Sequence, residues 1–93
     1  MKDDRFEWDD EKAAKNERRH GVTFERARKV FDDPNAIDEP DDDPDEERWR
    51  RIAMAGGQVL FVVTTERDGR QRIITARRAT RNEQDHYYRQ ALP

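Results

Sequence analysis

The sequence VLFVVTTERDGRQRIITARR, residues 59–78, is the most informative segment of the chain. It contains two runs rich in β-branched residues on either side of Asp68-Gly69, and an Asp-Gly pair in this setting is typical of a tight hairpin turn with positive φ. The segment therefore predicts a β-hairpin. Its first strand is apolar at nearly every position, which indicates burial on both faces near the middle of a sheet. Arginines frame the second strand, so the hairpin also offers a platform for an anionic ligand.

The residues next to this hairpin extend the expected sheet. Residues 48–55 have a β-like pattern and are joined by Gly56-Gly57 to the first hairpin strand. Three consecutive antiparallel strands are therefore expected at residues 48–55, 59–66 and 70–77. Residues 5–8 alternate polar and apolar side chains, which predicts a further short strand near the start of the chain.

Three helices are expected around these strands. The first covers residues 11–19, after a cap at Asp9-Asp10 and before a terminating Gly21. The second follows a Thr23 cap and carries an apolar stripe until Asp33-Pro34. The third begins at the capping box formed by residues 80–83 and runs to about residue 90.

A short acidic segment divides the chain by charge. Residues 38–47, DEPDDDPDEE, hold eight acids, two prolines and no base, whereas residues 48–93 hold ten arginines against four acids. The acidic segment cannot bury itself and is expected to be a loop. It lacks the ligand spacing of a calcium loop, so a solvated loop is favoured over a metal site. It could also screen the basic half from nonspecific nucleic acid or engage a basic partner surface.

The composition limits the classes of function. A chain of 93 residues with 32% hydrophobic and 44% charged residues indicates one domain with a thin core. The absence of cysteine excludes disulfides and thiolate metal sites. No phosphate-binding glycine loop or metal-ligand cluster is visible, so neither cofactor nor metal is expected. With no signal peptide or membrane-spanning run, a cytoplasmic protein without a membrane partner is expected.

Two groups of residues resemble the signatures of the BrnT toxins. The N-terminal group comprises Phe6-Glu7-Trp8-Asp9, Lys12-Ala13, Asn16, His20-Gly21-Val22, Phe24, Glu25, Ala27, Val30-Phe31 and Asp33-Pro34. The C-terminal group comprises residues 73–80, IITARRAT, followed by Glu83 and by Tyr87 or Tyr88. The resemblance implies a RelE-like α+β fold over residues 1–93. In that fold, a small antiparallel β-sheet has two helices after its first strand and one C-terminal helix, in the order β-α-α-β-β-β-α.

The same resemblance implies a function and a partner. The expected protein is a ribonuclease toxin of a bacterial type II toxin–antitoxin pair, with RNA as its substrate. Its expected partner is a BrnA-like antitoxin with a ribbon-helix-helix DNA-binding part, and operator DNA would be bound only through the complex. The alternative function is a non-catalytic module that binds the antitoxin and supports autoregulation of the operon.

Cleavage of RNA without a metal requires a base for the 2′-hydroxyl, cations for the crowded phosphorane and an acid for the leaving oxygen. Arginine suits the second role because its fork matches two phosphate oxygens. The resemblance favours Arg77 and Arg78, which strand alternation places on opposite faces, so that at most one faces a given substrate. Arg67 is a third candidate, although it lies near the turn and far from the other two. Each of the three could instead pair with a carboxylate.

Two side chains are candidates for proton transfer, and one for stacking on RNA. His20 could act as a general base, but its position before Gly21 fits a helix cap equally well. Glu66 could act as a base or as a strand-end partner in an ion pair. Trp8 is either a platform for an RNA base or a core aromatic at the end of the first strand.

Overall fold

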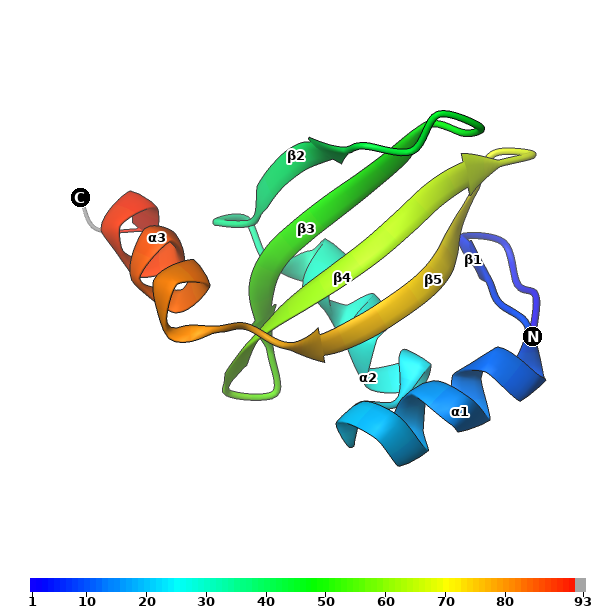
Figure 1. Ribbon diagram of the computed structural model, residues 1–93, viewed down its shortest axis with the longest axis horizontal. Coiled ribbons are helices and arrows are strands. Elements are labelled where there is room, and N and C mark those ends of the chain that lie inside the picture. The colour runs from blue at the N-terminus through cyan, green and yellow to red at the C-terminus, as the bar shows by residue number, and fades with distance from the viewer. Residues whose placement is uncertain (92–93) are drawn as a thin grey trace.

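A five-stranded sheet in the order β1-β5-β4-β3-β2 forms the centre of the computed structural model, which describes residues 1–91 (Figure 1). The elements in chain order are β1 (Phe6–Glu7), α1 (Asp10–His20), α2 (Phe24–Ala27), the 3-10 helix η1 (Arg28–Asp32), β2 (Ile37–Asp41), β3 (Arg48–Ala55), β4 (Gln58–Arg67), β5 (Arg70–Arg78) and α3 (Arg81–Ala91). The expected α+β class, with two helices after the first strand and one at the end, is confirmed.

The hairpin formed by β4 and β5 is the best-predicted part of the fold. Both turn residues have positive φ, 53° at Asp68 and 77° at Gly69, as the Asp-Gly pair predicts. β4 lies between β3 and β5 and is antiparallel to both. Its apolar run is buried on both faces of the sheet, which explains why nearly every position is hydrophobic.

The sheet differs from the expected one at both edges. β1 pairs with β5 in parallel, so the sheet is mixed and not purely antiparallel. Residues 38–41, expected within the acidic loop, belong to β2, so four strands follow the first helices and the loop shrinks to residues 42–47. The acids of β2 are accommodated by arginines of β3: Asp38 pairs with Arg51 at 2.7 Å, and Glu39 with Arg50 at 3.6 Å.

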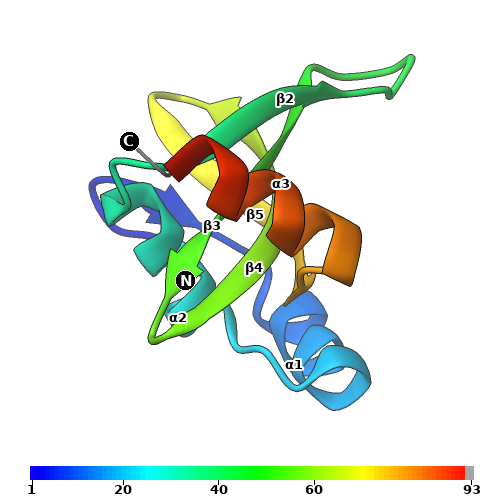
Figure 2. The ribbon, with the colours of Figure 1, turned by 90° about the vertical axis from the view of Figure 1, so that its left-hand side faces the viewer.

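Helices cover the two faces of the sheet unequally. One face packs against α2 and η1, and its core includes Leu60, Val62 and Phe24; it is called the core face below. The opposite face meets α3 through a smaller cluster that includes Ile52, Val59 and Tyr87 (Figure 2); it is called the α3 face. No helix in the described part of the chain is long and apolar enough to cross a membrane.

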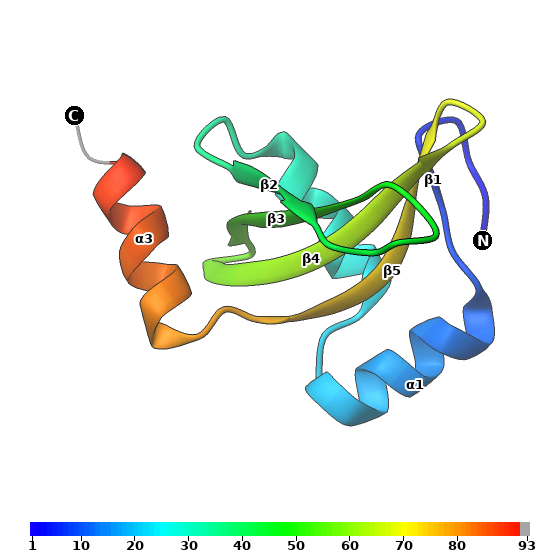
Figure 3. The ribbon, with the colours of Figure 1, turned by 45° about the horizontal axis from the view of Figure 1, so that its top comes forward.

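The outer edge of β5 is closed by a side chain where β1 ends. The amide of Asn16 on α1 donates to the carbonyl oxygens of Ala76 at 2.8 Å and Val22 at 3.0 Å. Its oxygen accepts from the Ala76 N–H at 3.2 Å and the Thr75 hydroxyl at 3.3 Å. One asparagine thereby satisfies the backbone groups that a neighbouring strand would pair, and it holds α1 along this edge (Figure 3).

A β-bulge interrupts the pairing of β4 with β5. Thr64 pairs with Ile73 and Val63 pairs with Thr75, so Ile74 has no partner on β4. Beyond this extra residue, Phe61 pairs with Arg77 and Leu60 with Arg78. The bulge therefore sets which face of the sheet each of the two adjacent arginines occupies.

Candidate nucleic-acid interface

A groove of about 610 Å³ lies at the end of the sheet nearest to the β4–β5 turn. It is called the basic groove here, and its lining residues are Lys12, Glu46, Glu47, Arg48, Thr65, Glu66, Arg67, Arg72 and Ile74. Four of these side chains are cations and three are carboxylates. The groove thus combines phosphate-binding groups with groups that can accept a proton.

Neighbouring strands place the cations of this groove by strand alternation. Thr65 of β4 pairs with Arg72 of β5. On the other side of β4, Thr64 pairs with Trp49 of β3, which places Arg48 opposite Thr65. The side chains of Arg48, Thr65 and Arg72 therefore form a row across the α3 face. Lys12 reaches the same groove from α1. Arg72 also lies 3.7 Å from the carboxylate of Glu7.

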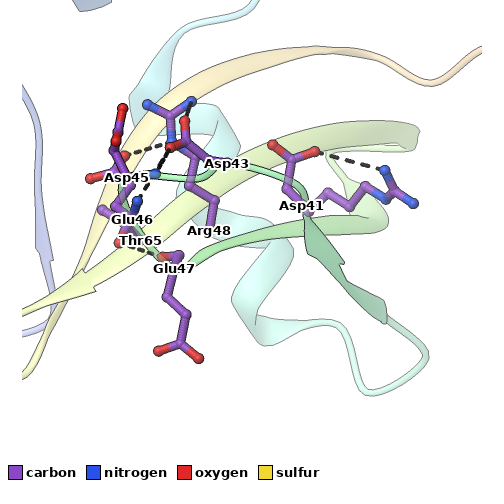
Figure 4. Close-up of polar contacts among 8 residues, drawn as sticks. Asp41, Asp43, Asp45, Glu46, Glu47, Arg48 and Thr65 are labelled. Atoms are coloured by element: carbon purple, nitrogen blue, oxygen red, sulfur yellow. Dashed lines mark hydrogen bonds and ion pairs between the residues drawn. The ribbon is translucent and has the colours of Figure 1, made fainter.

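Glu46 and Glu47 of the acidic loop line the groove, and Figure 4 shows the polar contacts of this loop. Arg48 bonds to Glu46 at 2.5 Å and lies 3.3 Å from Asp43. The Thr65 hydroxyl donates to the Glu47 carbonyl at 2.7 Å, which attaches the loop backbone to β4. The hydrogen bond to Glu46, with the nearby charges, raises the pKa of Arg48 above its usual value. The loop therefore supplies counter-charges to one cation of the groove.

Glu66 and Arg67, two candidates from the sequence, both lie in this groove. Both are exposed at the end of β4. Arg67 forms no ion pair within residues 1–91, whereas Arg48 does. Glu66 also lines a pocket of about 230 Å³ on the core face, beside the exposed Trp49. Its carboxylate is thus at the rim, between the two faces of the sheet.

His20 lies in an adjoining pocket of about 210 Å³ between α1 and β5. The imidazole is half-buried at the last residue of α1, and Gly21 ends the helix with a φ of 71°. Lys12 and Ile74 line both this pocket and the basic groove. His20 and Glu66 therefore lie along one continuous surface, but they do not line the same pocket.

Arg77 lies in a different pocket, of about 460 Å³, beneath α3. Its guanidinium forms two hydrogen bonds to Glu83, at 2.8 and 3.0 Å, and stacks 4.0 Å from the centre of the Phe61 ring. Burial raises the pKa of Glu83, but the hydrogen bonds from Arg77 and Thr80 outweigh it and hold that pKa below its usual value. Arg77 is therefore already bound to a carboxylate.

Arg77 and the basic groove share the α3 face but are separated along it. Arg77 pairs with Phe61 of β4, whereas Arg72 of the groove pairs with Thr65. These two β4 residues are four positions apart, or about 13 Å along a strand. Arg78 is exposed and pairs with Leu60, so alternation directs its side chain toward the opposite face. The structure therefore places Glu66 and Arg67 in one groove and His20 in an adjoining pocket, and it separates Arg77 and Arg78 from that group and from each other.

The interpretation of Trp8 as an RNA platform is wrong. Its side chain is only 7% exposed and packs edge-to-face on Phe24 with ring centres 5.8 Å apart. An aromatic ring must present a face to stack on a base, and this ring is part of the core.

Sequence reasoning missed three cations of the basic groove: Lys12, Arg48 and Arg72. They come from α1, β3 and β5 and are brought together only by the fold. The alternation of Arg48 and Arg50 at the start of β3 was the one local signal, because it directs both side chains to the same face. Within residues 1–91, no group of three or more His, Cys, Asp or Glu side chains is arranged to hold a metal ion.

Comparison with known proteins identifies the family of the chain. No curated protein matches the sequence. The family model described as "Ribonuclease toxin, BrnT, of type II toxin-antitoxin system" matches residues 8–83, which is most of the chain. The matched range begins before α1 and ends inside α3. The chain therefore belongs to the BrnT family of ribonuclease toxins, whose type II systems pair each toxin with an antitoxin.

Proposed function

We propose that this toxin is a metal-independent endoribonuclease and that RNA lies in the basic groove when it is cut. The observation that carries the proposal is that Lys12, Arg67 and Arg72 line one groove together with the exposed Glu66 at its rim. Cations along the groove suit a phosphate backbone, and a carboxylate beside them can accept a proton. The 2′-hydroxyl supplies the nucleophile, so RNA and not DNA is the substrate.

In the proposed reaction, Glu66 takes the proton of the 2′-hydroxyl as that oxygen attacks the adjacent phosphorus. A new bond forms between the 2′-oxygen and phosphorus, and the bond to the 5′-oxygen breaks. Arg67 and Arg72 stabilise the negative charge of the phosphorane. The leaving oxygen takes its proton from Lys12 within the groove or from His20 in the adjoining pocket.

Arg77 and Arg78 keep a proposed role outside this groove. An RNA strand that leaves the groove along the α3 face would meet Arg77 after about 13 Å. Arg77 would bind this RNA only after its hydrogen bonds to Glu83 break. Arg78, on the other face, would bind RNA only around the edge of the sheet. Separate Arg77→Ala and Arg78→Ala variants assign these contacts.

The decisive experiment is cleavage of RNA by the purified chain in the presence of a chelator. Wild type should cut, and Glu66→Gln and Arg67→Ala should each slow cutting by about 10²-fold or more, because each removes one component of the chemistry. Arg89→Ala is the matched control, since Arg89 is exposed on α3 and lines none of the four pockets described above. Equal rates for Glu66→Gln and the control would refute the assignment of the base.

The alternative is a module that binds its antitoxin without cutting RNA. The observation in its favour is the separation of the candidate residues, together with the binding of Arg77 to Glu83. RNA binding without cleavage, at any chelator or salt concentration, would support it. Under either proposal the partner is a BrnA-like ribbon-helix-helix antitoxin, and operator DNA is bound through the complex.

A further inference from the structure

The surface next to the basic groove carries more cations than the proposed chemistry uses. The adjoining pocket is lined by Lys15 and Arg19 as well as by His20, and its floor includes Thr75 of β5. We propose that this pocket is a second RNA subsite, in which Lys15 and Arg19 bind backbone phosphates of the strand after it leaves the basic groove. This inference rests on the proposed function and names where the substrate continues.

Helical spacing aligns the cations of this subsite. Lys12, Lys15 and Arg19 occupy positions i, i+3 and i+7 of α1 and therefore share one side of the helix. Asn16 lies on the same side, and its buried amide is hydrogen-bonded to Ala76 of β5. Because Asn16 fixes the rotation of α1, the three cations lie beside the edge of β5, where all three remain exposed to a ligand.

The two cavities form one path. Lys12 and Ile74 line both, so the two cavities adjoin and a strand in the basic groove would continue past these two side chains into the subsite. Ile74 is the extra residue of the β-bulge and is half-buried between them. The rise from Lys12 to Arg19 is about 10 Å, which has room for roughly one or two phosphates beyond the groove.

The charges of this path are available for a ligand. Within residues 1–91, none of Lys12, Lys15 and Arg19 forms an ion pair, although eleven such pairs are present. Cations in the last turn of a helix are commonly explained by its dipole. That explanation covers Arg19 but not Lys12 or Lys15, which precede the last turn of α1. A phosphate backbone accounts for all three.

The test compares RNA strands of two lengths that carry 2′-O-methyl groups and therefore cannot be cut. Fluorescence anisotropy should show that wild type binds a strand of about twelve nucleotides more tightly than one of about four. The double variant Lys15→Gln/Arg19→Gln should weaken binding of the long strand several-fold. It should also reduce the slope of log Kd against log salt by about 1.4, or about 0.7 for each phosphate that is no longer neutralised. Binding of the short strand should not change.

The matched control is Arg18→Gln/Lys29→Gln, which removes the same charge from exposed positions outside both cavities. An equal effect of the two double variants would show a general loss of charge and would overturn the subsite. Equal affinity of wild type for both lengths would overturn it as well, while leaving the basic groove intact. Failure of wild type to bind the short strand would instead refute the proposed function.

Discussion

Replacement of Asn16 by alanine tests how α1 is attached to the sheet. The side chain makes four hydrogen bonds, three of them to backbone groups of Val22 and Ala76, and both of these residues are fully buried. Each buried group left without a partner costs about 1–3 kcal/mol. Water that enters the space left by the amide recovers part of this, so Asn16→Ala should lower the free energy of unfolding by about 3–5 kcal/mol.

This loss is large for a chain of 93 residues, whose total stability is expected to be about 5–14 kcal/mol. The midpoint of thermal unfolding should fall by roughly 15–30 °C. Circular dichroism with urea and thermal unfolding measures both quantities. Asn82→Ala is the control, because Asn82 is exposed on α3. A cost below about 1 kcal/mol for Asn16→Ala, or one equal to the control, would refute the role given to this amide.

A second variant, Asn16→Asp, separates hydrogen bonding from shape. The carboxylate has nearly the same outline but cannot donate to the two carbonyl oxygens that Asn16 bonds. At pH 7 it should destabilise the protein more than alanine does, because it buries a charge that faces two acceptors. Its buried carboxylate binds a proton more tightly in the folded than in the unfolded state, so the loss should shrink as the pH falls. A loss that does not depend on pH would contradict this account.

Three further perturbations test other parts of the structure. Tyr87→Phe removes the 2.6 Å hydrogen bond to Asp33 and should cost about 1–2 kcal/mol in urea unfolding. Burial, with help from Asp33, raises the pKa of Tyr87 to about 12, so the wild-type protein should lose stability between about pH 10 and 12, and the variant should not. Burial raises the pKa of Asp33, but the hydrogen bonds from Tyr87 and from backbone N–H groups outweigh burial and lower that pKa. The stability of the wild-type protein should therefore also fall as the pH drops below about 4. This fall should be smaller in Tyr87→Phe, which lacks one of these hydrogen bonds. Glu46→Gln removes a counter-charge from Arg48 and should tighten binding of a short RNA strand several-fold; unchanged affinity in the anisotropy assay would show that the acidic loop does not screen the groove. Gly69→Ala places a side chain at a φ of 77° and should lower stability by about 1–2 kcal/mol in thermal unfolding, whereas Gly69→Asn should cost less.

The parts of the fold that sequence reasoning predicted are those set by neighbouring residues. The Asp68-Gly69 turn, the cap at Asp9 and the capping box at Thr80 each depend on contacts within four residues. The strand at residues 37–41 could not be predicted in the same way. Its acids are tolerated only because β3 presents Arg50 and Arg51 to them, and cross-strand pairing is not visible in a local pattern.

The candidate site was predicted less well for the same reason. The basic groove combines side chains from α1, β3, β4 and β5, so its composition depends on the complete topology. Glu66 and Arg67 were identified because they flank the predicted turn. Trp8 was ambiguous because a residue at the end of an edge strand can face either solvent or core, and packing on Phe24 decides this.

The extra residue in β5 has a consequence for comparing members of the family. If Ile74 were absorbed into regular pairing, each later residue would shift by one position against β4. Ala76 would then pair with Phe61, Arg77 would turn toward the core face, and Arg78, opposite Val59, would lie on the α3 face. Counting residues from the turn therefore does not identify equivalent arginines in a relative whose strand lacks the insertion. Equivalent positions are those that pair with the same residue of β4, so Phe61 is the reference from which to align this strand.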